Sequence, residues 1–185
     1  YNTKKITPAV IEFVDIAGLV KGASKGEGLG NKFLANIRET DAIVHVVRCF
    51  EDENITHVES TIDPLRDIET INLELIFSDI DAVKKRLDKS LSMVKTGDKK
   101  YKIESEFLQR LYDHLSALKP ARTLDNLSEE DEEILKSLFL LTAKPVIYTA
   151  NISEADMGKD ETELPLVMKV KEYAKQENAE YMVIC

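Results

Sequence analysis

Two kinds of hydrophobic pattern alternate along this chain. Short apolar runs bounded by polar residues are typical of buried strands, and apolar residues three and four positions apart are typical of amphipathic helices. Strand-like runs occur at residues 9–15, 41–47, 145–150 and 181–185, and helical spacing occurs at residues 28–39 and 164–176. This alternation predicts an α/β fold with a mostly parallel sheet and helices on both of its faces.

Residues 65–141 interrupt that alternation with helical spacing alone. After a break at residues 96–98, a second stripe ends before Pro120, and Ser128 with Asp131 predicts a capping box that opens a third helix through Leu141. We expect an inserted helical, coiled-coil-like domain at residues 65–142, between the two parts of a sheet domain at residues 1–64 and 143–185. The first stripe predicts a long helix with a coiled-coil-like seam, formed by Ile76, Ile80, Val83, Leu87, Leu91 and Val94.

The composition is that of an ordinary soluble globular protein, with 43% apolar and 32% charged residues. The net charge of -9 argues against a protein that binds nucleic acid with its whole surface, although it leaves room for a local basic patch. The two cysteines, Cys49 and Cys185, are too few for a disulfide framework and fit a reducing compartment. No apolar run has membrane-spanning length and no signal-peptide pattern opens the sequence. We therefore expect a cytoplasmic protein that does not bind a membrane.

The first motif with chemical meaning is Asp15-Ile16-Ala17-Gly18, at the end of the first strand-like run. A carboxylate at the carboxyl edge of a parallel sheet suits a Mg²⁺ site, because open α/β folds bind their ligands there. Asp15 is able to hold a metal-bound water, and the backbone of Gly18 is able to approach a terminal phosphate because glycine has no Cβ. The alternative is a strand followed by a surface loop.

The second motif is Asn151-Ile152-Ser153-Glu154, which follows the third strand-like run. GTP-binding proteins carry Asn-Lys-x-Asp at such a strand end, where the Asp accepts two hydrogen bonds from guanine. Glu154 is one methylene longer than that Asp, which weakens the guanine clamp and with it the main reason to prefer GTP over ATP. The alternative is that Asn151 is a helix cap or a turn residue.

Together with the helical insertion, these motifs closely resemble the YchF family of Obg-like ATPases. Residues 15–33, 38–50, 63–64 and 67–72 look like signature segments of that family, and the resemblance spans the whole chain. It implies a P-loop NTPase-type fold and a nucleotide hydrolase that is related to translation GTPases, prefers ATP, uses Mg²⁺ and associates with the ribosome. A GTPase that binds nucleic acid or the ribosome is the alternative function.

The resemblance also implies roles for individual residues. Asp15 would hold Mg²⁺ through a water, Gly18 would contact the γ-phosphate, and Asn151, Ile152 and Glu154 would line the base. No catalytic residue is assigned with certainty by the motifs.

Two further positions bear on catalysis in such a hydrolase. Leu19 stands where many GTPases carry the glutamine that orients the attacking water, so that water would be positioned by another group. His57, in the long polar segment after the second strand-like run, is a candidate for proton transfer because histidine titrates near neutrality. The sequence contains no Gly-x-x-x-x-Gly-Lys-Ser/Thr motif, so we expect an internal segment that lacks the phosphate loop and the C-terminal domain and that is inactive on its own.

Two other classes of function compete with this interpretation. A Rossmann dinucleotide site is disfavoured because its third glycine would fall at Asn31. A binding module is compatible with it, since residues 84–102 are strongly basic and suit contact with a phosphate backbone, although a solvated helix face is the plainer explanation. The hypothesis is that the tip of the helical domain contacts ribosomal RNA through Lys95, Lys99, Lys100 and Lys102.

Overall fold

The computed structural model describes residues 9–15, 29–51, 61–95 and 97–185. Three parallel strands form a sheet in the order β1-β2-β3: β1 (Ile43–Arg48), β2 (Val146–Asn151) and β3 (Glu180–Ile184). Each strand overlaps one of the predicted apolar runs and extends one residue beyond it. The α/β class is confirmed by these strands and by the helices that pack on them.

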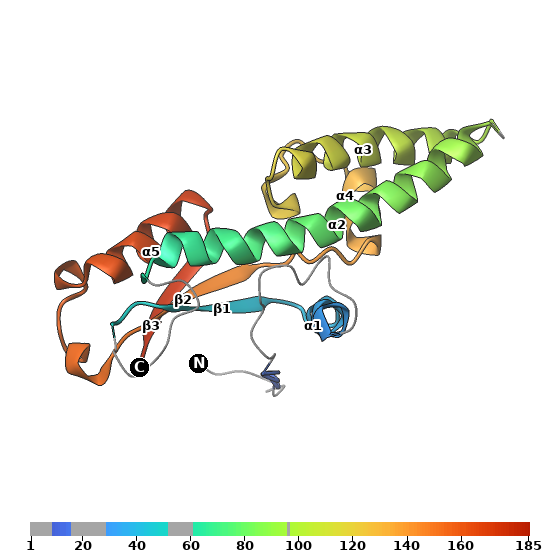
Figure 1. Cartoon of the computed structure of the whole chain (residues 1–185). Coiled ribbons are helices and arrows are strands. Elements are labelled where there is room, and N and C mark those ends of the chain that lie inside the picture. The colour runs from blue at the N-terminus through green and yellow to red at the C-terminus, as the bar shows by residue number, and fades with distance from the viewer. Residues whose placement is uncertain (1–8, 16–28, 52–60, 96) are drawn as a thin grey trace, which may run out of the picture.

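Two helices cover one face of the sheet, α2 (Pro64–Val94) and α5 (Pro165–Gln176), as Figure 1 shows. Between them and the strands lies a core that includes Ile68, Tyr148 and Val167, none of which is exposed. On the opposite face, Val44 and Val46 of β1 remain 42% and 54% exposed. Among the described residues, the apolar core of the sheet therefore lies on the side of α2 and α5.

The second half of α2 leaves the sheet and pairs with α3 (Lys99–Ser116), which runs back beside it (Figure 1). A short 3-10 helix, η1 (Ala121–Thr123), and α4 (Glu129–Ser137) complete the base of this hairpin. We call the part of α2 beyond Asp79, together with α3 and α4, the helical arm. Its core is formed by Val83, Leu87, Phe107, Leu108, Leu111 and Leu115, which confirms most of the predicted stripes. Leu91, at the far end of the first stripe, is 48% exposed instead.

Local sequence signals explain where these helices begin. The Asp63 carboxylate accepts from the backbone amides of Leu65 and Arg66, and Pro64 occupies the first turn, where its missing N–H costs nothing. The predicted capping box is confirmed, because Ser128 Oγ accepts from the Asp131 amide and the Asp131 carboxylate accepts from the Ser128 amide, both at 3.1 Å. These caps fix the starts of α2 and α4.

Two predicted elements are wrong in extent or kind. Residues 9–15 form no strand and are exposed, with Val10 91% and Phe13 80% accessible. A strand is stable only when a neighbour pairs with its backbone, and the described residues place no strand beyond the outer edge of β1. The third helix ends at Ser137 rather than at Leu141, because Phe139 adopts a positive φ of 50° that stops the helix.

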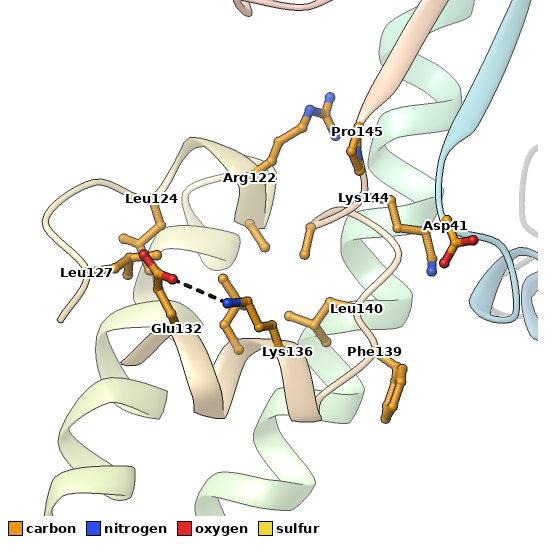
Figure 2. Close-up of a pocket in the computed structure, with 13 residues that line it drawn as sticks. Asp41, Arg122, Leu124, Leu127, Glu132, Lys136, Phe139, Leu140, Lys144 and Pro145 are labelled. Atoms are coloured by element: carbon orange, nitrogen blue, oxygen red, sulfur yellow. Dashed lines mark hydrogen bonds and ion pairs between the residues drawn. The ribbon is translucent and has the colours of Figure 1, made fainter. Parts of the chain in front are cut away.

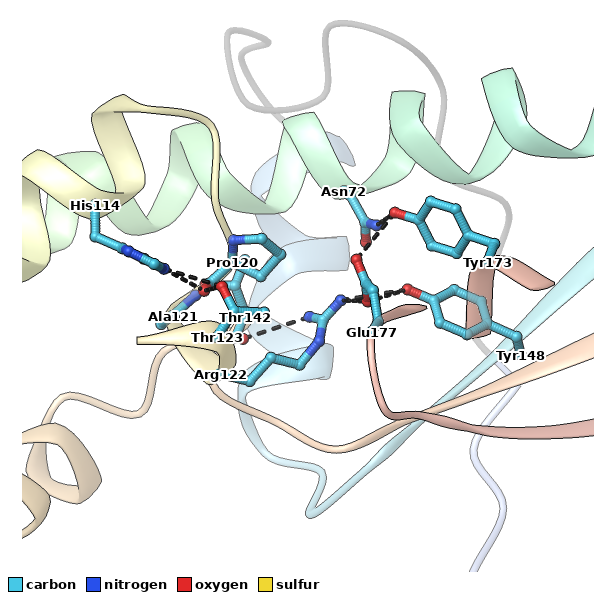
Figure 3. Close-up of polar contacts among 10 residues, drawn as sticks. All are labelled: Asn72, His114, Pro120, Ala121, Arg122, Thr123, Thr142, Tyr148, Tyr173 and Glu177. Atoms are coloured by element: carbon cyan, nitrogen blue, oxygen red, sulfur yellow. Dashed lines mark hydrogen bonds and ion pairs between the residues drawn. The ribbon is translucent and has the colours of Figure 1, made fainter. Parts of the chain in front are cut away.

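A polar cluster joins the base of the arm to the sheet (Figure 3). The Glu177 carboxylate, just after α5, accepts from Arg122 at 2.6 Å, Tyr148 at 2.8 Å and Tyr173 at 3.0 Å, and Asn72 of α2 donates to the Tyr173 hydroxyl at 3.1 Å. Burial opposes the charge of Glu177, but the hydrogen bond and charge of Arg122 outweigh it and lower the pKa of Glu177. The cluster therefore ties α2, η1, β2 and the end of α5 together.

Candidate functional site

The carboxyl ends of the three strands lie level with one another. Arg48 of β1 is in register with Asn151 of β2, and Asn151 is in register with Ile184 of β3. The pairing continues one residue further, because the Cys49 amide donates to the Asn151 carbonyl at 2.8 Å and the Ile152 amide donates to the Ile184 carbonyl at 2.9 Å. Asn151 therefore sits in the middle of the sheet edge where parallel α/β folds bind ligands.

The predicted base motif follows from this edge. Ile152 is buried in the sheet core and anchors the motif, while Glu154 opens a short 3-10 helix, η2 (Glu154–Asp156), on the surface. In the part of the chain that the structure describes, the Asn151 amide and the Glu154 carboxylate make no side-chain hydrogen bond or ion pair. The two side chains are thus available to a ligand, and Asn151 is not a cap for η2, since the residue at that position is Ser153.

Neighbouring groups fix the turn that carries Glu154. Ser153 Oγ and Lys159 Nζ each donate to the Asp156 carboxylate at 2.7 Å. The hydrogen bond from Lys159, followed by that from Ser153, lowers the pKa of Asp156, so this carboxylate is charged and engaged. Asp156 is committed to the turn, which leaves Glu154 as the acceptor that faces solvent.

The first motif is placed only in part. Asp15 is exposed at the end of the irregular segment 9–15, and the structure does not bring it into the sheet as predicted. Gly18, Leu19 and His57 lie outside the described residues. The predicted meeting of Asp15 and Asn151 at one sheet edge is therefore not observed.

Among the side chains that the structure places, no group of three or more His, Cys, Asp or Glu residues is arranged to hold a metal. A lone carboxylate suits Mg²⁺, which usually keeps several waters and takes its other ligands from substrate phosphates. Asp15 therefore fits the role of one water-mediated ligand and no more.

The cysteines and His45 belong to the fold. Cys49 is buried, and burial raises the pKa of its thiol to about 12, so it is not a reactive thiolate; Cys185 is exposed. His45 faces Tyr148 on the next strand with 5.7 Å between ring centroids, and burial lowers its pKa to about 4. His45 is thus a neutral packing residue.

The basic region is less uniform than its sequence indicates. Three of its cations have acidic neighbours: Lys84 contacts Asp88 at 2.8 Å, Arg86 forms a short ion pair with Glu104, and Lys102 lies 3.9 Å from Glu106. Lys95, Lys99 and Lys100 are exposed at the turn between α2 and α3 and form no ion pair with any residue that the structure places. Lys85 and Lys89 of α2 are also exposed and without a described ion pair, so the unpaired positive charge extends along α2 to the tip of the arm.

A pocket of about 440 Å³ lies at the other end of the sheet, where η1 and α4 meet the chain that enters β2 (Figure 2). Its wall is mainly apolar, with Leu124, Leu127 and Leu140, and Arg122 and Lys144 stand at its side. Because it adjoins Pro145, at the start of β2, it is distinct from the carboxyl edge that carries Asn151. Sequence patterns gave no sign of it.

Among the helices that the structure describes, none is both long and apolar enough to cross a membrane. The longest, α2, carries charged residues along its whole exposed side. Its length serves to connect the sheet to the tip of the arm.

Comparison with known proteins gives a consistent assignment. A family model described as 50S ribosome-binding GTPase matches residues 1–79. The chain is 51% identical over its full length to the ribosome-binding ATPase YchF of Bacillus subtilis and 46% identical over 98% of its length to that of Haemophilus influenzae, and it spans 50% and 49% of those proteins.

The fold agrees with the sequence matches. The structure of the Schizosaccharomyces pombe YchF GTPase superposes with a TM-score of 0.73 and 37% identity, over 91% of this chain and 46% of that one. The chain therefore spans about half the length of the proteins that it matches. On the identity over its full length and on the shared fold, the chain belongs to the YchF family.

Proposed function

We propose that this chain is the base-binding and arm-bearing part of a cytoplasmic, Mg²⁺-dependent ATP hydrolase that works on the ribosome. The observation that supports it best is the pair formed by Asn151 and Glu154 at the carboxyl edge of the sheet, both free to meet a ligand. The relatives are named ribosome-binding ATPases, which agrees with a base site that lacks the usual Asp. Residues 1–64 with 143–185 form the nucleotide domain in this proposal, and residues 65–142 form the insertion.

Each motif has a role in the proposed reaction. Asn151, Ile152 and Glu154 would line the base, Gly18 would lie against the γ-phosphate, and Asp15 would hold Mg²⁺ through a water. The metal would neutralise the charge that develops on the phosphate oxygens. Leu19 has no group that orients water, so another group would position it, and His57 is the candidate for proton transfer. The sequence lacks a Gly-x-x-x-x-Gly-Lys-Ser/Thr motif, so we expect no turnover from the 185-residue chain alone.

The test is a competition between ATP and GTP for the parent protein, which carries the phosphate loop. Wild type is expected to prefer ATP, and Glu154→Asp, which restores the usual guanine clamp, is expected to shift the ratio of dissociation constants toward GTP by about tenfold or more. Glu163→Asp is the matched control, because Glu163 is also exposed and without a described partner. A parent protein that prefers GTP would establish the GTPase alternative, and an unchanged ratio in Glu154→Asp would remove Glu154 from base recognition.

A second part of the proposal concerns the ribosome. The unpaired lysines at the tip suit phosphate contacts, so we expect Lys95, Lys99 and Lys100 to contact ribosomal RNA, with Lys102 weaker because of Glu106. Reversing the first three to Glu should weaken cosedimentation with ribosomes and lower the slope of log affinity against log salt by roughly two to three. Reversing Lys119, Lys169 and Lys175, which are exposed elsewhere, makes the same change in net charge and serves as the control. Equal loss in both sets would mean that net charge, and not the tip, drives binding.

A further inference from the structure

The helix that follows the Asp15–Gly18 segment in the chain is packed against the root of the helical arm. This helix, α1 (Leu29–Arg38), buries Leu34 and Ile37 against Leu75 of α2 and against Leu141. Leu141 is itself fully buried and lies on the chain that returns from the arm to β2. A shift of α1 would therefore press on the arm and on the return segment together, because close-packed side chains leave no slack.

Arg38, the last residue of α1, adds polar contacts to the same elements. Its guanidinium donates to Ser78 Oγ of α2 at 3.0 Å and to the Phe139 carbonyl at 3.2 Å, and it lies 3.7 Å from the Asp79 carboxylate. The planar fork of arginine makes this possible, because its several donors reach different acceptors at once. A single side chain of α1 thus contacts both the outgoing helix of the arm and the chain that comes back.

Asp79 organises the return segment that Arg38 reaches. It is fully buried, and its two oxygens accept from the Leu141 amide at 3.0 Å, the Thr142 amide at 2.7 Å and the Thr142 hydroxyl at 2.8 Å. Burial raises the pKa of Asp79, while these hydrogen bonds and the nearby charge of Arg38 act in the opposite direction. The carboxylate in the middle of α2 therefore depends on α1 for its nearest positive charge.

Lys144 holds α1 from the other side. Its ammonium group donates to the Arg38 carbonyl at 3.1 Å and to the Thr40 carbonyl, which satisfies free carbonyls at the negative end of the helix. Lys144 lies just before β2, whose far end carries Asn151. The end of α1 is thus fastened to the arm by Arg38 and to the entrance of β2 by Lys144.

We propose that Arg38 and Asp79 form a joint through which nucleotide occupancy and a partner held by the arm change each other's affinity. The proposal rests on the proposed function, because it places a nucleotide beside the segment that precedes α1. A nucleotide that binds more tightly to one position of α1 also favours one position of the arm. The partner held by the arm then changes the affinity for the nucleotide by the same factor, because such coupling is reciprocal. Arg38 is a positioning residue in this scheme and does not touch the nucleotide.

The test measures the affinity of the full-length protein for purified ribosomes with ADP and with a non-hydrolysable ATP analogue. Wild type is expected to show a ratio of the two affinities of about fivefold or more, the lower range of typical coupling. In Arg38→Gln this ratio is expected to fall below about twofold, while the affinity for the analogue without ribosomes changes less than about twofold. Arg110→Gln is the matched control, because it removes an ion pair to Asp131 at 2.7 Å within the arm and away from α1, and it should keep the wild-type ratio.

Arg38→Lys guards against a variant that fails to fold. It keeps the positive charge near Asp79 but offers no planar fork to Ser78 and the Phe139 carbonyl, so its ratio should lie between wild type and Arg38→Gln. Thermal unfolding by circular dichroism establishes which variants are folded. If only Arg38→Lys folds, its ratio decides: an intermediate ratio supports the joint, and the wild-type ratio overturns it.

The outcomes separate this inference from the function on which it rests. A wild-type protein that binds neither nucleotide nor ribosomes would refute the proposed function. A wild-type protein that binds both, with no coupling or with coupling that survives in folded Arg38→Gln, would leave the proposed function standing and overturn the joint.

Discussion

The helical arm and the three-stranded sheet differ in what covers their apolar residues. The arm closes its core between its own helices, where Leu108, Leu111 and Leu115 are fully buried. The sheet buries Tyr148 and Ala150 on the side of α2 and α5 but leaves Val44, Val46 and Met182 between 42% and 54% exposed on the other side. In the part of the chain that the structure describes, the arm is thus buried by its own helices, whereas the apolar core of the sheet lies on the side of α2 and α5.

The largest expected effect tests the closed core of the arm. Leu111→Ala removes a fully buried side chain between α2 and α3, so the free energy of unfolding should fall by about 3 kcal/mol. Urea denaturation followed by circular dichroism measures it. Val46→Ala on the open face should cost about 0.5 kcal/mol or less, as surface substitutions do. Equal losses at the two positions would mean that the open face is covered in solution.

A smaller effect tests the buried charge inside the arm. Glu104 is 4% exposed, and its carboxylate accepts hydrogen bonds from the Arg86 guanidinium and, at 2.7 Å, from Ser90 Oγ. Burial opposes the charge of Glu104, but these partners lower its pKa. Glu104→Gln should cost about 2 kcal/mol, because it removes the charge of a buried carboxylate that Arg86 and Ser90 hydrogen-bond. The control, Glu106→Gln, removes only an exposed contact of 3.9 Å with Lys102 and should cost roughly 0–0.5 kcal/mol. If Glu104→Gln were as stable as wild type, packing alone would set the alignment of α2 and α3.

The smallest effect belongs to the sheet and depends on pH. The folded state lowers the pKa of His45 from 6.5 to about 4, mainly by burial and then by the charge of Arg122. The unfolded chain therefore binds a proton more readily, so this contribution is present above pH 6.5 and is lost as the pH falls toward 4. We expect His45→Gln to be less sensitive than wild type to acid by about 1 kcal/mol at pH 5.5, measured by urea denaturation at pH 7 and pH 5.5. Identical pH dependence of the unfolding free energy in the two proteins would contradict the conclusion that His45 is neutral in the folded state.

Sequence patterns predict the arm better than the sheet, and the reason is physical. The stripe that begins at Ile76 and the Ser128–Asp131 capping box depend on residues near in sequence; the capping box is confirmed, and the stripe is confirmed as far as Leu87, whereas Leu91 is 48% exposed. The strand expected at residues 9–15 depends on a neighbour for its hydrogen bonds, and apolar composition alone did not reveal whether one is present. Phe139 ends α4 through a positive φ that its residue type gives no reason to expect.

The candidate site divides in the same way. Asn151 and Glu154 follow a strand that is correctly predicted, so their place at the sheet edge could be inferred from sequence. Arg38 and Asp79 were missed, because their contacts join residues far apart in the chain. A signal did exist for Asp79: it lies beside Ile80 in an otherwise apolar helical stripe, where a carboxylate is expected only if buried donors meet it.

The uninterrupted course of α2 has a consequence for the scale of motion. Its 31 residues correspond to about 46 Å at 1.5 Å per residue, with Ile68 fixed in the sheet core near one end and the lysine-rich turn at the other. Such a rod acts as a lever: a pivot of about 5° at the sheet would sweep the far turn through about 4 Å. A displacement at the base can thus be too small to break any packing contact and still move the tip by roughly the length of a hydrogen bond or more. A movement of that size is enough to make or lose a contact with a partner.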